Sequence, residues 1–210
     1  MNRKEQTYKR IVRNRIIAVV REKRPEYVEP LIDVLSRSGI TTIEITLTTP
    51  DALELISLHA KRPDLLIGAA SVLERNQADR VFSAGAHFFA SPCTNSTIIE
   101  AAHEAECVAI SGGLTPQELY TAYQAGADLV KIFPLPPNGS AYLRSILGPM
   151  PEIRLAPSGG ITDSNGKELL DSGAVALNVG SWLTPKHESL QTRIEETERR
   201  AGLLLKAIDR

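Results

Sequence analysis

The stretch DLVKIFP, residues 128–134, places a lysine in a run with the apolar character of a buried strand. Side chains alternate between the two faces of a strand, so Lys131 shares its face with Leu129 and Phe133. A buried ammonium is costly unless it is paired or loses its proton, because desolvation disfavours the charged form. The unprotonated amine is a nucleophile. The alternative is that Lys131 reaches solvent from the end of its strand.

A second inward-facing charge is predicted in TTIEITL, residues 41–47. Alternation puts Glu44 on the face opposite Ile43 and Ile45, which suit packing under helices. A carboxylate held inside a fold is either the structural partner of a cation or a general acid and base whose pKa burial has moved. Both interpretations pair Glu44 with Lys131, and we favour catalysis.

The elements that must position these two groups recur regularly along the chain. Short strand-like runs alternate with segments of helical spacing. Glycines that end helices reinforce the pattern, and Thr115-Pro116 and Thr162-Asp163 are predicted to begin helices. The strand-like runs are 15–21, 41–47, 65–70, 87–91, 107–111, 128–133, 153–157 and 174–180, and the glycines are Gly39, Gly85, Gly126 and Gly173.

Eight alternations in 210 residues predict one α/β domain, residues 1–210, folded as a (β/α)8 barrel. The residues before Ile16 predict an extra N-terminal helix that closes one end of the barrel. Residues 186–210 predict a long final helix whose charges form a solvated face. The alternative is an open, doubly wound sheet, which would need a glycine-rich turn after the first strand; VVREKRPEY offers none.

Two glycine-containing loops follow the last two predicted strands, in APSGG (156–160) and NVGSW (178–182). In barrels of this kind the loops after strands seven and eight are a recurrent phosphate site, because backbone N–H groups approach an anion closely where no side chain intervenes. We expect Gly159, Gly160, Gly180 and Ser181 to hold a phosphate. Tight turns are the other use of such glycines.

Three further polar or rigid positions lie at predicted strand ends, where barrel active sites are built. Arg21 ends the first strand and could bind a carboxylate through two parallel hydrogen bonds, or it could be an ordinary surface arginine. Ser71 follows the third strand as a small donor, and Pro92 follows the fourth as a rigid wall. We expect all three to border the same pocket.

Composition excludes several other classes of function. The chain carries 24 basic and 25 acidic residues, a net charge of -1, without a basic stripe, so no nucleic-acid partner is expected. No apolar run is long enough to span a membrane and the N-terminal stretch is too polar for a signal peptide, so we expect no membrane association and a cytoplasmic location. Cys93 and Cys107 are expected to be buried thiols, and the four histidines have no metal-ligand spacing, so no metal is expected.

The motifs, taken in order, resemble those of the 2-keto-3-deoxy-6-phosphogluconate (KDPG) and 4-hydroxy-2-oxoglutarate (KHG) aldolases. The resemblance covers about residues 15–183 and is carried by GITTIEITLTTPDA, IGAASVLERNQADRVFSAGAHFFASP, GADLVKIFP, GPMPEIRLAPSGGIT and NVGSWL. It implies a barrel-shaped class I aldolase that needs no metal or other cofactor, acts on a phosphorylated keto acid and forms a homotrimer.

The resemblance also implies a role for individual residues. Lys131 would form a Schiff base with the keto carbon, and Glu44 would move protons during dehydration and carbon–carbon cleavage. Phe133 would pack against the pyruvyl group. Ser71 takes the place of a threonine that helps hold the substrate carboxylate, and the hydroxyl of Ser158 favours the gluconate over the galactonate substrate.

This sequence departs from the family pattern at several of these positions. Many members have an arginine at the position of Thr48, where it contacts the carboxylate, so we assign that contact to Arg21. GAAS replaces the commoner GAGT, which adds a methyl group at Ala70. Two rival functions stay open: a phosphosugar isomerase or epimerase that uses Lys131 and Glu44 only for acid–base work, and a non-catalytic phosphosugar-binding module.

Overall fold

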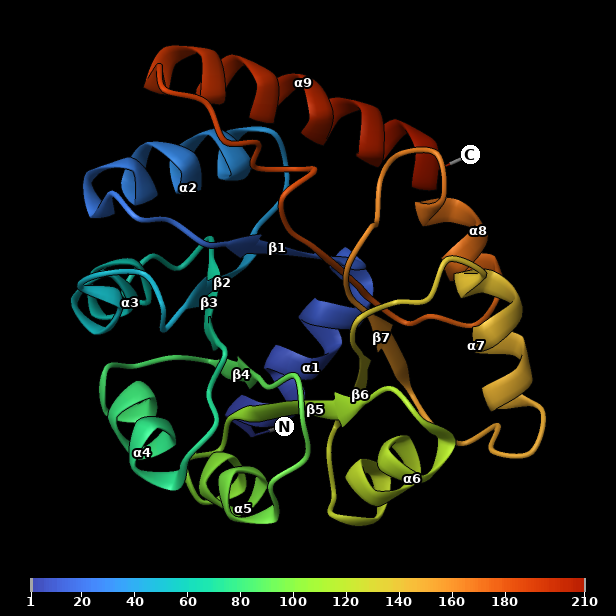
Figure 1. The fold of residues 1–210 in the computed structure, drawn as a ribbon. Coiled ribbons are helices and arrows are strands. Elements are labelled where there is room, and N and C mark those ends of the chain that lie inside the picture. The colour runs from blue at the N-terminus through green and yellow to red at the C-terminus, as the bar shows by residue number, and fades with distance from the viewer. Residues whose placement is uncertain (1, 210) are drawn as a thin grey trace.

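The computed structural model describes residues 2–209, which form a barrel of eight parallel strands surrounded by helices (Figure 1). Strands β1 to β7 pair in chain order, and β8 pairs with β1. Between β7 and β8 the barrel closes through single bridges and through the side-chain amide of Asn178, which donates to the carbonyl of Ala156 at 3.3 Å. The strands are β1 (Ile16–Val20), β2 (Thr42–Thr46), β3 (Leu66–Ala70), β4 (Phe88–Ala90), β5 (Val108–Gly113), β6 (Leu129–Ile132), β7 (Leu155–Pro157) and β8 (Leu177–Val179).

Helices connect the strands along the outside of the barrel, as the (β/α)8 prediction requires. The helices are α1 (Arg3–Asn14), the short 3-10 helix η1 (Pro25–Tyr27), α2 (Val28–Arg37), α3 (Ala52–His59), α4 (Arg75–Ser83), α5 (Ser96–Glu104), α6 (Pro116–Gln124), α7 (Gly139–Leu147), α8 (Gly166–Asp171) and α9 (Leu190–Ile208). The predicted helix-end glycines Gly39, Gly85, Gly126 and Gly173 all have positive φ.

The two predicted helix starts have different outcomes. Thr115 caps α6 and forms a reciprocal pair of hydrogen bonds with Glu118, as capping chemistry predicts. The prediction of a start at Thr162-Asp163 is wrong, because α8 begins at Gly166. There the hydroxyl of Thr162 accepts from the N–H of Ser164, and the N–H of Thr162 donates to Asn165, so the segment forms a turn instead.

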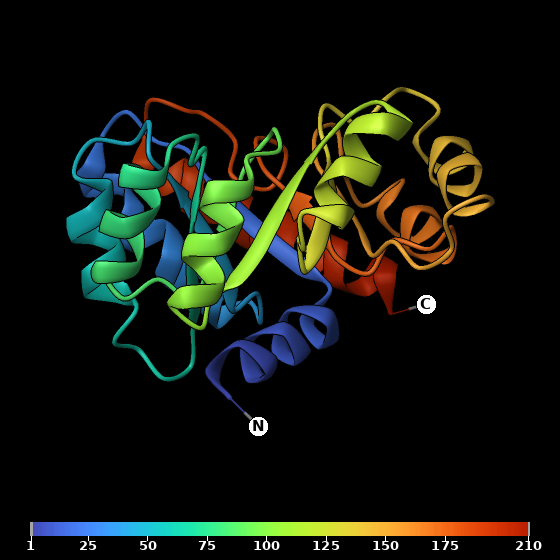
Figure 2. The ribbon, with the colours of Figure 1, turned by 90° about the horizontal axis from the view of Figure 1, so that it is seen from below.

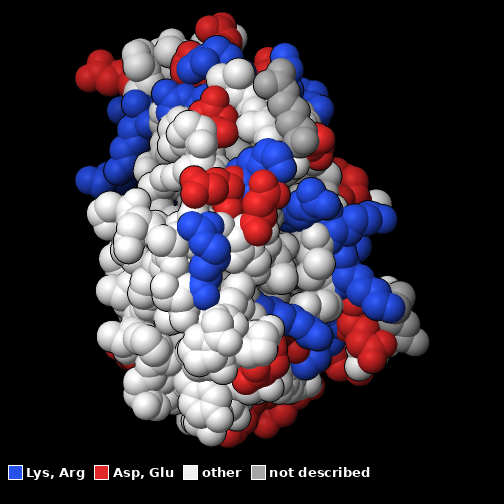
Figure 3. All heavy atoms as spheres, turned by 90° about the vertical axis from the view of Figure 1, so that its right-hand side faces the viewer, with Lys and Arg blue, Asp and Glu red and all other residues white. Residues whose placement is uncertain are grey.

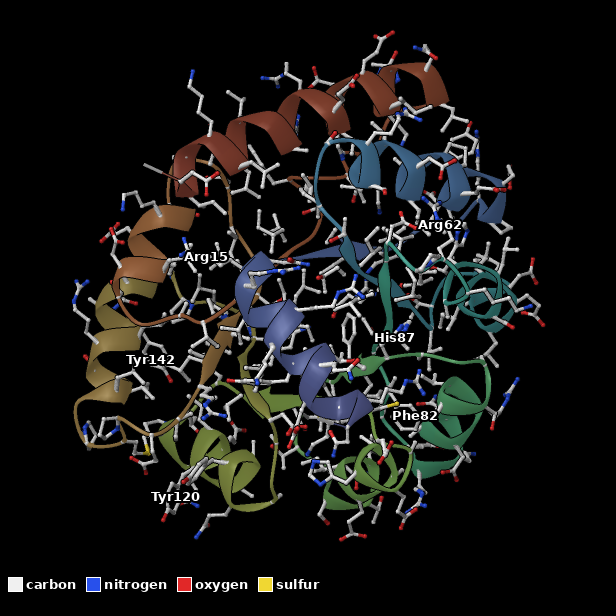
Figure 4. All side chains as sticks on the ribbon, turned by 180° about the vertical axis from the view of Figure 1, so that it is seen from behind. Arg15, Arg62, Phe82, His87, Tyr120 and Tyr142 are labelled. Atoms are coloured by element: carbon white, nitrogen blue, oxygen red, sulfur yellow. The ribbon has the colours of Figure 1, made fainter. Side chains whose placement is uncertain are left out.

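The alternation of side chains divides the core into two layers. Ile43 and Ile45 of β2 face the helices and pack in the outer cluster. Inside the barrel, Ile17, Leu66 and Phe88 pack with Ile11 of α1, which is fully buried. Helix α1 therefore closes the amino-terminal end of the barrel, where Figures 2 and 4 show it lying across the opening.

The final helix α9 lies against α2 and α8 (Figure 1). The prediction of a solvated charged face holds for most charged side chains of this helix and is wrong for one of them. Arg193 is only 3 % exposed and pairs with Glu22, which follows β1 and is also buried. The expectation for the cysteines is also partly wrong, because Cys107 is buried but Cys93 is exposed after β4.

Acidic and basic side chains are interspersed on the side of the molecule drawn in Figure 3. None of the helices described between residues 2 and 209 is both long and apolar enough to cross a membrane. The same residues contain no cluster of His, Cys, Asp and Glu side chains that could hold a metal ion.

Candidate active site

A cavity of about 450 Å³ opens at the carboxyl-terminal ends of the strands, opposite α1. This is the end at which (β/α)8 enzymes build their active sites. All eleven residues proposed for the site from sequence border this cavity. The roles proposed for them rest on their chemistry and on the family resemblance. The residues are Arg21, Glu44, Ser71, Pro92, Lys131, Phe133, Ser158, Gly159, Gly160, Gly180 and Ser181.

At the floor of the cavity, Lys131 of β6 and Glu44 of β2 form a buried pair. Their side chains are 7 % and 0 % exposed, and 3.5 Å separates Lys131 Nζ from Glu44 Oε1. Neither oxygen of Glu44 has a hydrogen-bond partner of good geometry within residues 2–209. Burial raises the pKa of the Glu44 carboxyl, although Lys131 and Arg21 oppose the rise. An amine beside a proton-exchanging carboxyl group can carry out nucleophilic chemistry.

On one wall, Arg21 extends from the end of β1 toward two hydroxyl groups. Its Nη1 donates to Thr48 Oγ1 at 3.2 Å, and its Nη2 donates to Ser71 Oγ at 3.4 Å. Ser71 has a left-handed backbone (φ 61°), which is uncommon for a residue other than glycine and recurs at functional sites. The guanidinium and the two hydroxyls together can hold a carboxylate close to Lys131.

The glycine loops after β7 and β8 meet on another wall of the cavity. Gly159 and Gly160 have positive φ, as a left-handed turn requires. At Gly180 a methyl group would meet, among residues 2–209, only Val19, at 3.7 Å, so the close packing of the backbone does not itself demand glycine there. The open backbone of these loops can approach an anion.

Phe133 also borders the cavity and is 42 % exposed. Lys131 Nζ lies 6.0 Å from the centre of its ring. Ala70, noted from sequence as a departure from the family pattern, borders the cavity as well. Sequence reasoning gave no role to five other residues that border it: Val19, Ile161, Trp182, Thr184 and Lys186. The last three lie in the loop after β8, and active sites of barrels are built from such loops, so their position in the sequence could have indicated them.

The fold and the cavity define a (β/α)8-barrel protein with a buried amine–carboxyl pair in a cavity that is also bordered by an arginine and two glycine loops. The model for the KDPG and KHG aldolase family matches residues 8–198. A KHG/KDPG aldolase of Escherichia coli is 34% identical over 172 residues, which cover 81% of each chain.

Solved structures agree with this match. A structure described as native KDPGal has a TM-score of 0.85 at 27% identity, over 92% of this chain and 94% of its own. The KDPG aldolase from Legionella pneumophila, with pyruvate captured as a covalent carbinolamine intermediate, has a TM-score of 0.77 at 28% identity, over 97% and 96% of the two chains. The chain therefore belongs to the KDPG and KHG aldolase family.

Proposed function

We propose that this protein is a class I aldolase that cleaves KDPG to pyruvate and glyceraldehyde 3-phosphate, and also KHG to pyruvate and glyoxylate. The observation that carries the proposal is the buried pair of Lys131 and Glu44, 3.5 Å apart at the floor of the cavity. The curated relative from Escherichia coli is named for both substrates, and the Legionella pneumophila relative captures pyruvate covalently.

The reaction begins at the keto carbon of the substrate. The unprotonated Nζ of Lys131 attacks C2, and the resulting carbinolamine loses its hydroxyl group as water to give a protonated imine. Glu44, whose pKa is raised by burial, supplies the proton that the departing hydroxyl needs, directly or through a water molecule. The positive nitrogen then withdraws electrons from C3.

Cleavage breaks the C3–C4 bond. Glu44 or its water removes the proton of the C4 hydroxyl, C4 becomes the aldehyde carbon of glyceraldehyde 3-phosphate, and the bonding pair moves into the imine to form an enamine. Protonation of the enamine at C3 regenerates an imine of pyruvate, and water releases pyruvate from Lys131. The atoms and electrons of these steps balance without an oxidant, a reductant or a metal ion.

The two ends of the substrate fix its register over Lys131. Arg21 and Ser71 bind the carboxylate beside the keto carbon, and Phe133 packs against the pyruvyl group. Ser158, the glycine loops and Ser181 bind the phosphate at the far end, and Pro92 forms the remaining rigid wall. Binding energy from the distant phosphate thereby holds the reacting carbon in place.

An assay with KDPG separates this proposal from its rivals. We expect the purified protein to release pyruvate and glyceraldehyde 3-phosphate in equal amounts, each detected by its own dehydrogenase. An isomerase or epimerase would give a new sugar acid without pyruvate, and a binding module would give neither product. Running the C4 epimer in parallel tests the gluconate preference expected from Ser158, which matters because one similar structure is described as KDPGal.

The proposal extends to assembly and location. We expect a homotrimer, which light scattering coupled to gel filtration would measure as three times the 22.9 kDa chain mass. We also expect the protein to act in the cytoplasm, where phosphorylated sugar acids are produced and consumed. A monomer in solution would contradict the first expectation.

A further inference from the structure

A ring of contacts links the end of β1 to the turn after β2. Arg21 Nη1 donates to Thr48, and the hydroxyl of Thr48 contacts that of Thr46 at 3.0 Å. The Thr46 hydroxyl contacts Thr49 Oγ1 at 3.1 Å, and Thr49 accepts the backbone N–H of Glu22 at 3.2 Å. Glu22 follows Arg21 in the chain, so the ring closes on the arginine at which it starts.

Arg193, near the C-terminal end of the sequence, holds the ring in place through Glu22. Glu22 accepts the N–H groups of Lys23 at 2.9 Å and Arg24 at 3.4 Å, and its other oxygen pairs with Arg193 of α9. The side chains of Glu22 and Arg193 are only 8% and 4% exposed. Desolvation alone would raise the pKa of Glu22, but Arg193 and the two N–H groups outweigh it and hold that pKa below its usual value.

The guanidinium of Arg193 also lies 5.4 Å from the centre of the Tyr27 ring, over its face. Tyr27 ends η1, the short helix that follows Glu22, so Arg193 holds the chain at two points just beyond Arg21. The helix α9 is therefore tied to the segment that carries Arg21, although the two are far apart in the sequence.

A contribution to stability alone does not account for this arrangement. A buried ion pair adds little net stability compared with apolar groups of similar size, because both charges lose their hydration. The ring ends at a guanidinium that borders the cavity and makes, within residues 2–209, hydrogen bonds to hydroxyls only. The charge of Arg21 is thus held in a fixed direction and left for a ligand.

We propose that Arg193 and Glu22, acting through Thr49, are positioning residues that aim the guanidinium of Arg21 at the substrate carboxylate. The inference rests on the proposed function, which makes Arg21 the carboxylate ligand. Thr49 is only 3% exposed and does not border the cavity, so it has no contact with substrate of its own.

Thr49→Val tests the ring, because it removes the hydroxyl while keeping the shape of the side chain. Pyruvate is titrated in the presence of borohydride, and the reduced adduct is measured by intact mass. We expect the pyruvate concentration for half-maximal adduct to rise about fivefold, with the maximal adduct unchanged. Thr49→Ser should restore the wild-type value, and Thr42→Val, which removes a hydroxyl from the opposite end of β2, should leave it unchanged.

The outcomes distinguish a failure of the positioning role from a failure of the proposed aldolase function. A wild-type half-saturation for Thr49→Val would overturn this inference while the proposed function stands. A loss of maximal adduct without a change in half-saturation would overturn it too, because that result indicates general disruption. No adduct on the wild-type protein would overturn the proposed function and this inference with it.

The anchor is tested by a double variant, Glu22→Met with Arg193→Met. Removing both buried charges avoids leaving one unpaired, so the variant should fold, which a thermal melt checks. We expect its half-saturation for pyruvate to rise at least as far as that of Thr49→Val. The matched control is Arg199→Met, on the exposed side of α9. A folded double variant with wild-type half-saturation would overturn the positioning role of Arg193.

Discussion

Glu44 and Lys131 meet across the interior of the barrel, with 3.5 Å between Glu44 Oε1 and Lys131 Nζ, although β2 and β6 are not neighbours in the sheet. Glu44 is the central residue of β2 and Lys131 is the third residue of β6, and both side chains face the interior of the barrel. Their contact is possible because the barrel curves the two strands toward each other. The enclosure that joins them also removes water, which raises the pKa of Glu44 and keeps it ready to exchange protons.

Glu44→Gln keeps the shape of the side chain and removes its ability to transfer protons. We expect kcat for KDPG cleavage to fall at least about a hundredfold, which is the usual contribution of a general acid–base group, while KM changes little. Steady-state kinetics on the purified variant measures both constants, and circular dichroism checks the fold. A kcat within about threefold of the wild type would remove Glu44 from the chemistry.

The pH dependence of the reaction follows from the environment of Glu44. Burial raises the pKa of its carboxyl above the ordinary 4.5, and the ionised form is the base in the cleavage step. Once the imine has formed, cleavage needs ionised Glu44, so kcat falls as the pH drops through this raised pKa, and we expect the acid limb of the kcat profile at a pH above 4.5. The residual activity of Glu44→Gln should lack this limb. A wild-type limb at or below 4.5 contradicts the assignment.

Arg21→Met removes the proposed ligand of the substrate carboxylate. We expect KM for KDPG to rise about tenfold or more, because a charged hydrogen-bonding partner is lost. Thr48 Oγ1 lies 3.2 Å from Arg21 Nη1, so an arginine at position 48 starts close to the same point. The double variant Arg21→Met with Thr48→Arg should therefore recover much of the affinity, and failure of both effects would place the carboxylate elsewhere.

Gly180→Ala tests the loop after β8. Within the described part of the chain the added methyl group meets only Val19, at 3.7 Å, so the variant should fold. The methyl group narrows the approach to the backbone N–H groups that we assign to the phosphate. We expect KM for KDPG to rise about tenfold. Cleavage of KHG, which carries no phosphate, is the control and should change little. Equal losses on both substrates would argue against a phosphate site here.

Much of this architecture could be predicted from the sequence. Alternation along β2 and β6 gave the inward faces of Glu44 and Lys131, and glycines such as Gly39 and Gly126 marked where helices end. The pairing of the two charged residues then followed from closure of the barrel. The alternation and the glycine positions are local features of the sequence, and the structure shows the inward faces and helix ends that they predict.

The remaining features depend on contacts that one sequence does not reveal. Arg193 carries no local mark that separates it from the solvated charges of α9, and only the packing of α9 on α2 buries it against Glu22. Thr162 resembles a helix cap, but its hydroxyl bonds the N–H of Ser164 instead. Cys93 lies in the segment that follows β4 and is exposed.

The central claim is that Lys131 is the amine that reacts with the keto acid. The most direct test incubates the protein with pyruvate and borohydride, measures intact mass and maps the modified peptide, with Lys131→Ala alongside. We predict one reduced pyruvyl adduct per chain, located at Lys131 and absent from the variant. An unmodified wild-type chain in excess pyruvate, or an adduct that persists in Lys131→Ala, would contradict the Schiff-base mechanism.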